Sequence, residues 1–149
     1  MAHIFGFSVI RVILEERFYS LNLNLKMPMH KNTEHQDEIS ILHNPNCSKA
    51  KKALAYAKSI TKKVASYEFS HSKTTPTQWR HIFSALGKGP KEILDKSLPY
   101  YQENIRGREF EEEDWLHVVI KNPQLIRSPI AMRAGRALIL DNPTDIYQL

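Results

Sequence analysis

Alternating apolar and polar stretches divide the chain after residue 38 into short strands and amphipathic helices. The apolar run at 39–42 predicts a buried strand, and the alternation over 63–69 predicts a second one. Between them, residues 48–60 predict a helix with a narrow apolar stripe. That stripe consists mostly of small residues at helical spacing: Ala50, Ala53, Leu54 and Ala57. The first part of the domain is therefore predicted as strand, helix and strand.

The next helix carries signals at both ends. Thr75 and Gln78 have the spacing of a capping box, and Pro76 takes the first helical position. Gly87 is placed to end the helix. Its apolar stripe, which we expect to face the core, consists of Trp79, Ile82, Phe83 and Leu86.

The remainder predicts a helical middle followed by two strands. A short helix is expected at 90–96, and a longer one with an acidic first turn is expected at 109–121. The side of the longer helix expected to be buried consists of Leu116, Val119 and Ile120. Apolar runs at 128–132 and 136–140 predict a hairpin, and a short turn or helix follows them. This order of elements predicts an α/β fold.

Residues 1–37 differ from the rest of the chain. An apolar stretch at 5–14 is interrupted by Arg11, and a polar segment follows it. Basic residues before the apolar run and a small-residue cleavage point are both missing, so a signal peptide is not expected. We expect residues 1–37 to be an extension or linker, in which residues 1–26 are either poorly ordered or present through an over-long start, and residues 38–149 to form the domain.

Composition limits the class of protein. The 149 residues suffice for one domain, and 42% hydrophobic with 25% charged residues is typical of globular proteins. No apolar run approaches the roughly 20 residues that span a bilayer, so no membrane association is expected. A single cysteine excludes an internal disulfide, and the expected location is the reducing cytoplasm.

The net charge of +5 is unevenly distributed. Between Ile39 and Tyr67 there is no acidic residue, whereas six lysines occur there. They are Lys49, Lys51, Lys52, Lys58, Lys62 and Lys63. Such a field favours anions, including a thiolate, although a solvated helix face would have the same composition. Only Tyr56 and Tyr67 interleave with the lysines, so nucleic-acid binding is not expected.

Cys47 directly precedes the helix predicted at 48–60, where free N–H groups and the helix dipole stabilise a thiolate. This position favours a reactive thiol over the alternative of a small buried residue. The side chains expected to support a thiolate or a bound anion are His43, Asn46, Ser48, Lys49 and Lys51. For His43 a second interpretation stays open, in which its imidazole only stabilises the loop.

Three stretches of the sequence carry a family resemblance. The first is ISILHNPNCSKAKKAL, where a strand leads to Asn-Pro-x-Cys at a helix start. The second is YEFSHSKTTPTQWRHIFSALGKGPKEIL, with a strand and a proline-opened helix, and the third is NPQLIRSPIAM. Together they extend over roughly 38–140 and resemble the arsenate reductase family, the glutaredoxin-coupled type that includes the Spx-type regulators.

The resemblance implies a thioredoxin-like fold, with a mixed sheet and a helical insertion before the C-terminal hairpin. It implies that Cys47 is the nucleophile and that a cis Ser128-Pro129 bond lies beside it. Ser128, Pro129 and Arg127 would then help to support the thiolate or its anion. No metal or bound cofactor is implied. Glutathione or another external thiol would be the co-substrate, and glutaredoxin would be a partner.

The sequence departs from the family at the three arginines that hold the oxyanion. Asp95, Ser128 and the segment 140–142 stand at those places, and Arg127 lies one position early. Each missing arginine removes charge-assisted hydrogen bonds to a tetrahedral anion. Ala50 stands where some Spx-type proteins carry a second cysteine, so turnover would need an external thiol. We therefore expect a thiol oxidoreductase rather than an efficient arsenate reductase.

Two other functions stay open at this point. The resemblance also fits an Spx-type interaction or regulatory module that binds RNA polymerase. It fits equally a redox-inert relative that has kept its cysteine. Thiol reactivity separates the oxidoreductase from both alternatives, because neither of them requires a reactive Cys47.

Overall fold

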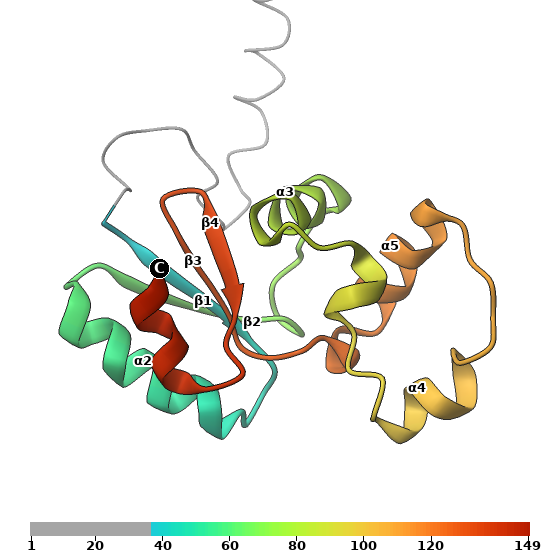
Figure 1. Ribbon diagram of the computed structural model, residues 1–149, viewed down its shortest axis with the longest axis horizontal. Coiled ribbons are helices and arrows are strands. Elements are labelled where there is room, and N and C mark those ends of the chain that lie inside the picture. The colour runs from blue at the N-terminus through green and yellow to red at the C-terminus, as the bar shows by residue number, and fades with distance from the viewer. Residues whose placement is uncertain (1–36) are drawn as a thin grey trace, which may run out of the picture.

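Four short strands form one mixed sheet in the computed structural model, which describes residues 37–149 (Figure 1). The strands are β1 (Ile39–His43), β2 (Val64–Glu68), β3 (Ile130–Arg133) and β4 (Arg136–Ile139). Their order across the sheet is β2-β1-β3-β4. β1 is parallel to β2 and antiparallel to β3, and β3 is antiparallel to β4. The predicted α/β fold with a mixed sheet is confirmed.

The predicted extension or linker at 1–37 concerns residues that, apart from Asp37, lie outside those described. From Asp37 onward, no helix is both long and apolar enough to cross a membrane.

Helix α2 (Ser48–Ile60) connects β1 to β2 and has the bounds that the sequence predicts. The buried residues of α2 are all alanines: Ala50, Ala53 and Ala57. Because these side chains are short, they let the helix backbone approach the sheet. Leu54, at the edge of the same stripe, is only partly buried. The small-residue stripe therefore marks the face of α2 that lies on the sheet.

Helix α3 (Pro76–Leu86) begins and ends as predicted. The Gln78 N–H donates to the Thr75 hydroxyl at 3.3 Å, and the Thr75 N–H donates to the Gln78 amide oxygen at 2.9 Å. Two N–H groups that lack helical partners are satisfied in this way. Gly87 has a φ of 62°, the left-handed conformation that ends many helices.

Replacing Thr75 by alanine is expected to lower the free energy of unfolding by about 1 kcal/mol, because the Gln78 N–H loses its acceptor. Urea unfolding followed by circular dichroism measures the change. Thr77→Ala is the matched control, since Thr77 is exposed in the first turn of the same helix. Equal losses in the two variants would contradict the role of Thr75 as the cap.

In the described chain, four short helices fill the insertion between α3 and β3. They are the 3-10 helix η2 (Pro90–Ile93), α4 (Pro99–Asn104), α5 (Glu112–Lys121) and the 3-10 helix η3 (Pro123–Leu125). The sequence predicts a helical middle but not α4 itself. The helix expected at 90–96 is shorter, because Leu94 pairs with Ile126 in an isolated antiparallel bridge. The Arg127 N–H donates to the Ile93 carbonyl at 2.8 Å, so the two ends of the insertion meet in a neck.

Helix α5 begins at Glu112 rather than at the predicted residue 109. The rings of Phe110 and Trp115 meet edge-on, with their centroids 4.8 Å apart. Phe110 precedes the N-cap Glu111, and Trp115 is the fourth helical residue, which is the spacing of a hydrophobic staple. Phe110 therefore fixes the entry of the chain into α5 from outside the helix.

A two-residue turn joins β3 to β4 and confirms the predicted hairpin. Ala134 and Gly135 both have left-handed backbones, with φ of 49° and 77°. Positive φ at both central residues is typical of the type I′ turn, whose twist matches that of the paired strands. The short 3-10 helix η4 (Pro143–Gln148) follows β4, as the terminal turn or helix predicts.

Helices cover both faces of the sheet and divide the core into two clusters. On one face, Ile39 and Ile41 of β1 pack with α2 and with Ile146 of η4. On the other face, Leu42 and Ile130 pack with α3 and the insertion. Figure 1 shows α2 and the C-terminal helix on one side of the sheet, and α3, α4 and α5 on the other. The thiol-bearing helix and the insertion therefore lie on opposite faces.

Burial separates the predicted core side chains into two groups. Trp79, Leu116 and Val119 are buried, with exposed fractions of 3%, 4% and 0%. Phe83, Leu86 and Ile120 are only partly buried against the same core, so the prediction of burial is wrong for them in this respect. Leu86 is the last residue of α3 and Ile120 the last but one of α5, and both keep only partial contact with the core.

Candidate active site around Cys47

The loop that carries the thiol connects the end of β1 to the start of α2. Asn46 adopts a left-handed backbone with a φ of 58°, a conformation that asparagine tolerates better than most residues. The Cys47 N–H donates back to the Asn44 carbonyl at 3.4 Å, and the Cys47 carbonyl accepts from the Lys51 N–H at 3.3 Å. Cys47 is therefore the N-cap residue of α2, as predicted from the sequence.

The Cys47 side chain is a free, partly exposed thiol. It makes no capping hydrogen bond to the first turn of α2, so direct N–H support of the sulfur stays a prediction. The first turn of α2 contains no acidic residue. Ser48, Lys49 and Lys51 are all exposed beside the thiol. The helix dipole and the neighbouring ammonium groups are the expected sources of a positive field at the sulfur, and this role of Lys49 and Lys51 stays a prediction.

Asn44 ties the thiol loop to the segment before β3. Its N–H donates to the Ser128 hydroxyl at 3.0 Å, and its side-chain amide donates to the Ile126 carbonyl at 3.0 Å. The Ser128-Pro129 peptide bond is cis, which confirms that part of the prediction. The Pro129 side chain is fully buried. Ser128 thus lies against the loop of Cys47, while direct contact of Pro129 with the sulfur stays a prediction.

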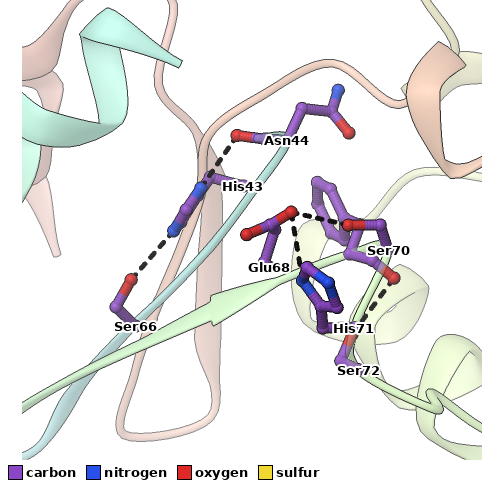
Figure 2. Close-up of polar contacts among 8 residues, drawn as sticks. His43, Asn44, Ser66, Glu68, Ser70, His71 and Ser72 are labelled. Carbon is purple, nitrogen blue, oxygen red and sulfur yellow. Dashed lines mark hydrogen bonds and ion pairs between the residues drawn. The ribbon is translucent and has the colours of Figure 1, made fainter. Parts of the chain in front are cut away.

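His43 uses both ring nitrogens in hydrogen bonds (Figure 2). Nδ1 lies 2.9 Å from the Asn44 carbonyl, and because a carbonyl only accepts, this nitrogen carries the hydrogen. Nε2 lies 2.9 Å from the hydroxyl of Ser66 on β2. The imidazole therefore braces the thiol loop against the neighbouring strand in the observed conformation, which is the second of its two predicted roles.

A polar cluster occupies the carboxyl end of β2, next to the end of β1 that carries His43 (Figure 2). The Ser70 hydroxyl donates to the Glu68 carboxylate at 2.7 Å, and His71 Nδ1 lies 3.2 Å from the same oxygen. The Ser70 hydrogen bond holds the pKa of the Glu68 carboxyl below its ordinary value, and His71 and His43 lower it further. Glu68 therefore places a negative charge at the carboxyl end of β2. This carboxylate is missing from the site predicted from the sequence.

Arg127 does not join the thiol loop. Its guanidinium donates to the Asp141 carboxylate at 2.6 Å, and its backbone N–H is bound at the neck of the insertion. Asp95 turns back on its own segment and accepts hydrogen bonds from Ser97. Asp95, Ser128 and Asp141 stand where the family resemblance leads us to expect oxyanion-binding arginines.

The other two arginines of the C-terminal part also have partners. Arg133 lies 3.9 Å from the Asp37 carboxylate, and Arg136 donates to the Gln148 carbonyl at 3.1 Å. The geometry assembled at the thiol loop is therefore one cysteine, one bracing imidazole, a serine hydroxyl and a lysine-rich helix. Such a set suits thiol–disulfide exchange, which needs one nucleophilic sulfur and space for a second sulfur compound to approach it.

A family model described as "ArsC family" matches residues 42–149. The chain belongs to the ArsC family. Escherichia coli K12 YfgD, described as uncharacterized, is 24% identical to this ArsC-family protein over 75% of this chain and 96% of YfgD. The global transcriptional regulator Spx of Streptococcus pneumoniae R6 is 26% identical over 72% of this chain and 82% of Spx.

Solved structures confirm the thioredoxin-like fold of this ArsC-family protein. A Yersinia pestis protein provisionally described as an arsenate reductase has a TM-score of 0.65 at 25% identity, covering 75% of this chain and all 100% of that one. The arsenate reductase of Vibrio cholerae has a TM-score of 0.62 at 21% identity, covering 74% and 96% of the two chains. At that identity the second likeness supports the fold alone.

Asn44 and Ser66 contact the thiol loop but are missing from the site predicted from the sequence. The signal that could have marked Asn44 is the Asn-Pro dipeptide, which Asn46 separates from Cys47. Ser66 has no such signal, because its role depends on the pairing of β1 with β2. Its hydroxyl reaches His43 through that parallel register.

Proposed function

We propose that this ArsC-family protein is a cytoplasmic thiol oxidoreductase in which Cys47 is the only protein nucleophile. The Cys47 thiolate attacks one sulfur of a disulfide, the S–S bond breaks, and the other sulfur leaves as a thiolate. The proposal is supported by the position of a partly exposed cysteine at the start of α2, with no acid in the first helical turn.

Resolution of the mixed disulfide needs a thiol from outside the chain, because Cys47 is the sole cysteine. A second thiol such as glutathione attacks the mixed disulfide, releases Cys47 as a thiolate and ends in a disulfide itself. This cycle regenerates Cys47 and leaves one half of the substrate in a mixed disulfide with the external thiol. A further external thiol that attacks this mixed disulfide releases the second substrate thiol, which completes the transfer of two electrons to the substrate disulfide. Glutaredoxin is the corresponding protein partner, and no bound cofactor is required.

Incubation with oxidised glutathione is expected to add one glutathione to the protein, at Cys47 alone. Intact-mass spectrometry followed by peptide mapping detects the adduct, and dithiothreitol should remove it. Cys47→Ser should stay unmodified, whereas Thr77→Ala, at an exposed position of α3, should still react. A protein that gains no adduct under mildly oxidising conditions would refute the proposed chemistry.

The relationship to Spx favours a second candidate, an interaction module that binds RNA polymerase. In that function the contact with RNA polymerase does not need Cys47, because binding uses the surface of the fold. Co-purification with RNA polymerase that survives Cys47→Ser, together with absence of a glutathione adduct, would favour this candidate. A glutathione adduct that forms on wild type and not on Cys47→Ser, together with no binding of RNA polymerase by wild type, would favour the oxidoreductase.

A further inference from the structure

Five lysines occur within residues 49–62, on α2 and just beyond its end. We define them as the α2 lysine face, consisting of Lys49, Lys51, Lys52, Lys58 and Lys62. All five residues are exposed. The helix buries only its alanine stripe, so the lysines flank the solvent side on which Cys47 is partly exposed.

The α2 lysine face has no ion-pair partner within residues 37–149. None of the five ammonium groups has an ion pair or side-chain hydrogen bond with a described residue. Three arginines elsewhere have carboxylate partners: Arg80 pairs with Glu113, Arg127 with Asp141, and Arg133 with Asp37. Lys88 and Lys96 have no ion pair with a described residue either, but they stand singly, whereas five lysines occur within residues 49–62, where the sequence has no acidic residue. Unpaired positive charge is therefore dense on α2 and just after it.

The length of this face exceeds that of a small thiol. An α-helix rises about 1.5 Å per residue, so Lys58 lies roughly 16 Å along the axis from Cys47. A tripeptide spans at most roughly 10 Å when fully extended. Lys51 and Lys58 are seven residues apart and lie on the same side of α2, two turns from each other. A macromolecular surface can contact this stripe while a tripeptide at Cys47 cannot reach its far end.

We propose that the α2 lysine face docks an acidic protein surface that presents the disulfide with which Cys47 exchanges. This inference rests on the proposed thiol chemistry and names its partner class. Electrostatic complementarity would raise the rate of encounter and align the partner's disulfide with the sulfur at the end of the face. The exchange itself forms one S–S bond at Cys47 and breaks the partner's S–S bond, with the displaced sulfur leaving as a thiolate.

A protein fits this face better than a nucleic acid does. Tyr56 is the aromatic residue of α2, and it is half-buried with its ring 5.8 Å from that of Tyr147. It is thus engaged within the fold rather than presented as a platform for stacking bases. A partner in thiol exchange must also carry sulfur, which proteins supply.

Two synthetic peptides of about fifteen residues, roughly 50 Å when extended, test the inference. Each carries one central cysteine activated as a mixed disulfide with 2-thiopyridine, flanked by glutamates in one peptide and by glutamines in the other. Attack by Cys47 releases 2-thiopyridone, whose absorbance gives the rate. At low ionic strength we expect the acidic peptide to react at least about tenfold faster. The ratio should approach one as sodium chloride is raised, because salt screens exposed charges.

Charge reversal at the far end of the face should remove this preference. In Lys58→Glu/Lys62→Glu the acidic-to-neutral rate ratio is expected to fall to one or below. The matched control is Lys88→Glu/Lys96→Glu, which changes the net charge equally at exposed positions following α3 and η2. The control should keep the wild-type ratio. Equal loss in both variants would reduce the effect to net charge and overturn the docking proposal.

The outcomes on the unmodified protein separate this inference from the function on which it rests. If the neutral peptide reacts no faster with wild type than with Cys47→Ser, the proposed thiol chemistry fails. If wild type reacts equally fast with both peptides, only the docking inference fails. A short DNA duplex that binds wild type more tightly than the acidic peptide would assign the face to nucleic acid and overturn it as well.

Discussion

Replacing Trp79 by alanine is expected to lower the free energy of unfolding by about 3–5 kcal/mol. The Trp79 side chain is 3% exposed in the cluster that joins α3 to the sheet and the insertion. Its ring stacks with that of Phe69, at 5.8 Å between centroids, and with that of Phe83, at 5.7 Å. Removing the indole leaves a cavity beside two aromatic rings that belong to separate segments and cannot easily close it.

Urea unfolding of the variant, followed by far-ultraviolet circular dichroism of the backbone, measures this loss. His81→Ala is the matched control, because His81 is exposed on the same helix and should change stability by less than about 0.5 kcal/mol. A change below about 1 kcal/mol in Trp79→Ala would show that the core tolerates the cavity. That result would contradict the assignment of this face of α3 to the interior.

Arsenate is expected not to be reduced above the background that Cys47→Ser shows. A tetrahedral oxyanion must be held against the sulfur while negative charge develops, and hydrogen bonds from charged donors supply that stabilisation. Three missing arginines at about 1.5–3 kcal/mol each forfeit about 4.5–9 kcal/mol. At about 1.4 kcal/mol per factor of ten, this corresponds to roughly 10³–10⁶ in rate. Arg127 cannot restore it in the observed conformation, because its guanidinium is bound to Asp141.

The assay contains arsenate, reduced glutathione, glutaredoxin and the glutathione reductase that couples turnover to NADPH. A family arsenate reductase run in parallel shows that the coupling enzymes work. Turnover that depends on Cys47 would mean that Arg127, Arg133 or Arg136 leaves its present partner and enters the site. In that event Arg127→Ala, Arg133→Ala and Arg136→Ala would identify which arginine moves.

Local sequence signals predicted much of the fold because they act over a few residues. The bounds of α2 and α3 follow from apolar spacing and from the capping box of Thr75 and Gln78, which is present as expected. Errors arise where distant contacts decide. The helix expected at 90–96 ends early because Leu94 meets Ile126, and no local pattern contains that pairing. Similarly, α5 starts late because Phe110 packs on Trp115 from outside the helix.

The candidate site divides in the same way. The placement of Cys47 at the start of α2 could be predicted, since it depends on one loop and one helix. The partners of His43 and Arg127 could not, because Ser66 and Asp141 belong to other strands and segments. The cis Ser128-Pro129 bond was predicted from the family resemblance and not from composition or periodicity.

The neck between Leu94 and Ile126 makes the insertion a closed excursion from the sheet. The entropy of closing a loop grows only slowly with its length, by about 0.6 kcal/mol for each doubling. Residues added to or removed from the insertion's exposed turn at 106–109 therefore cost little closure entropy, provided that the neck stays joined and the buried side chains of α5 stay in the core. The thiol loop is fixed by Asn44 to Ser128 and Ile126 at this neck, so changes confined to the exposed turn leave its anchoring contacts in place. That turn is thus the part of this fold in which length and surface can diverge while the geometry at Cys47 is preserved.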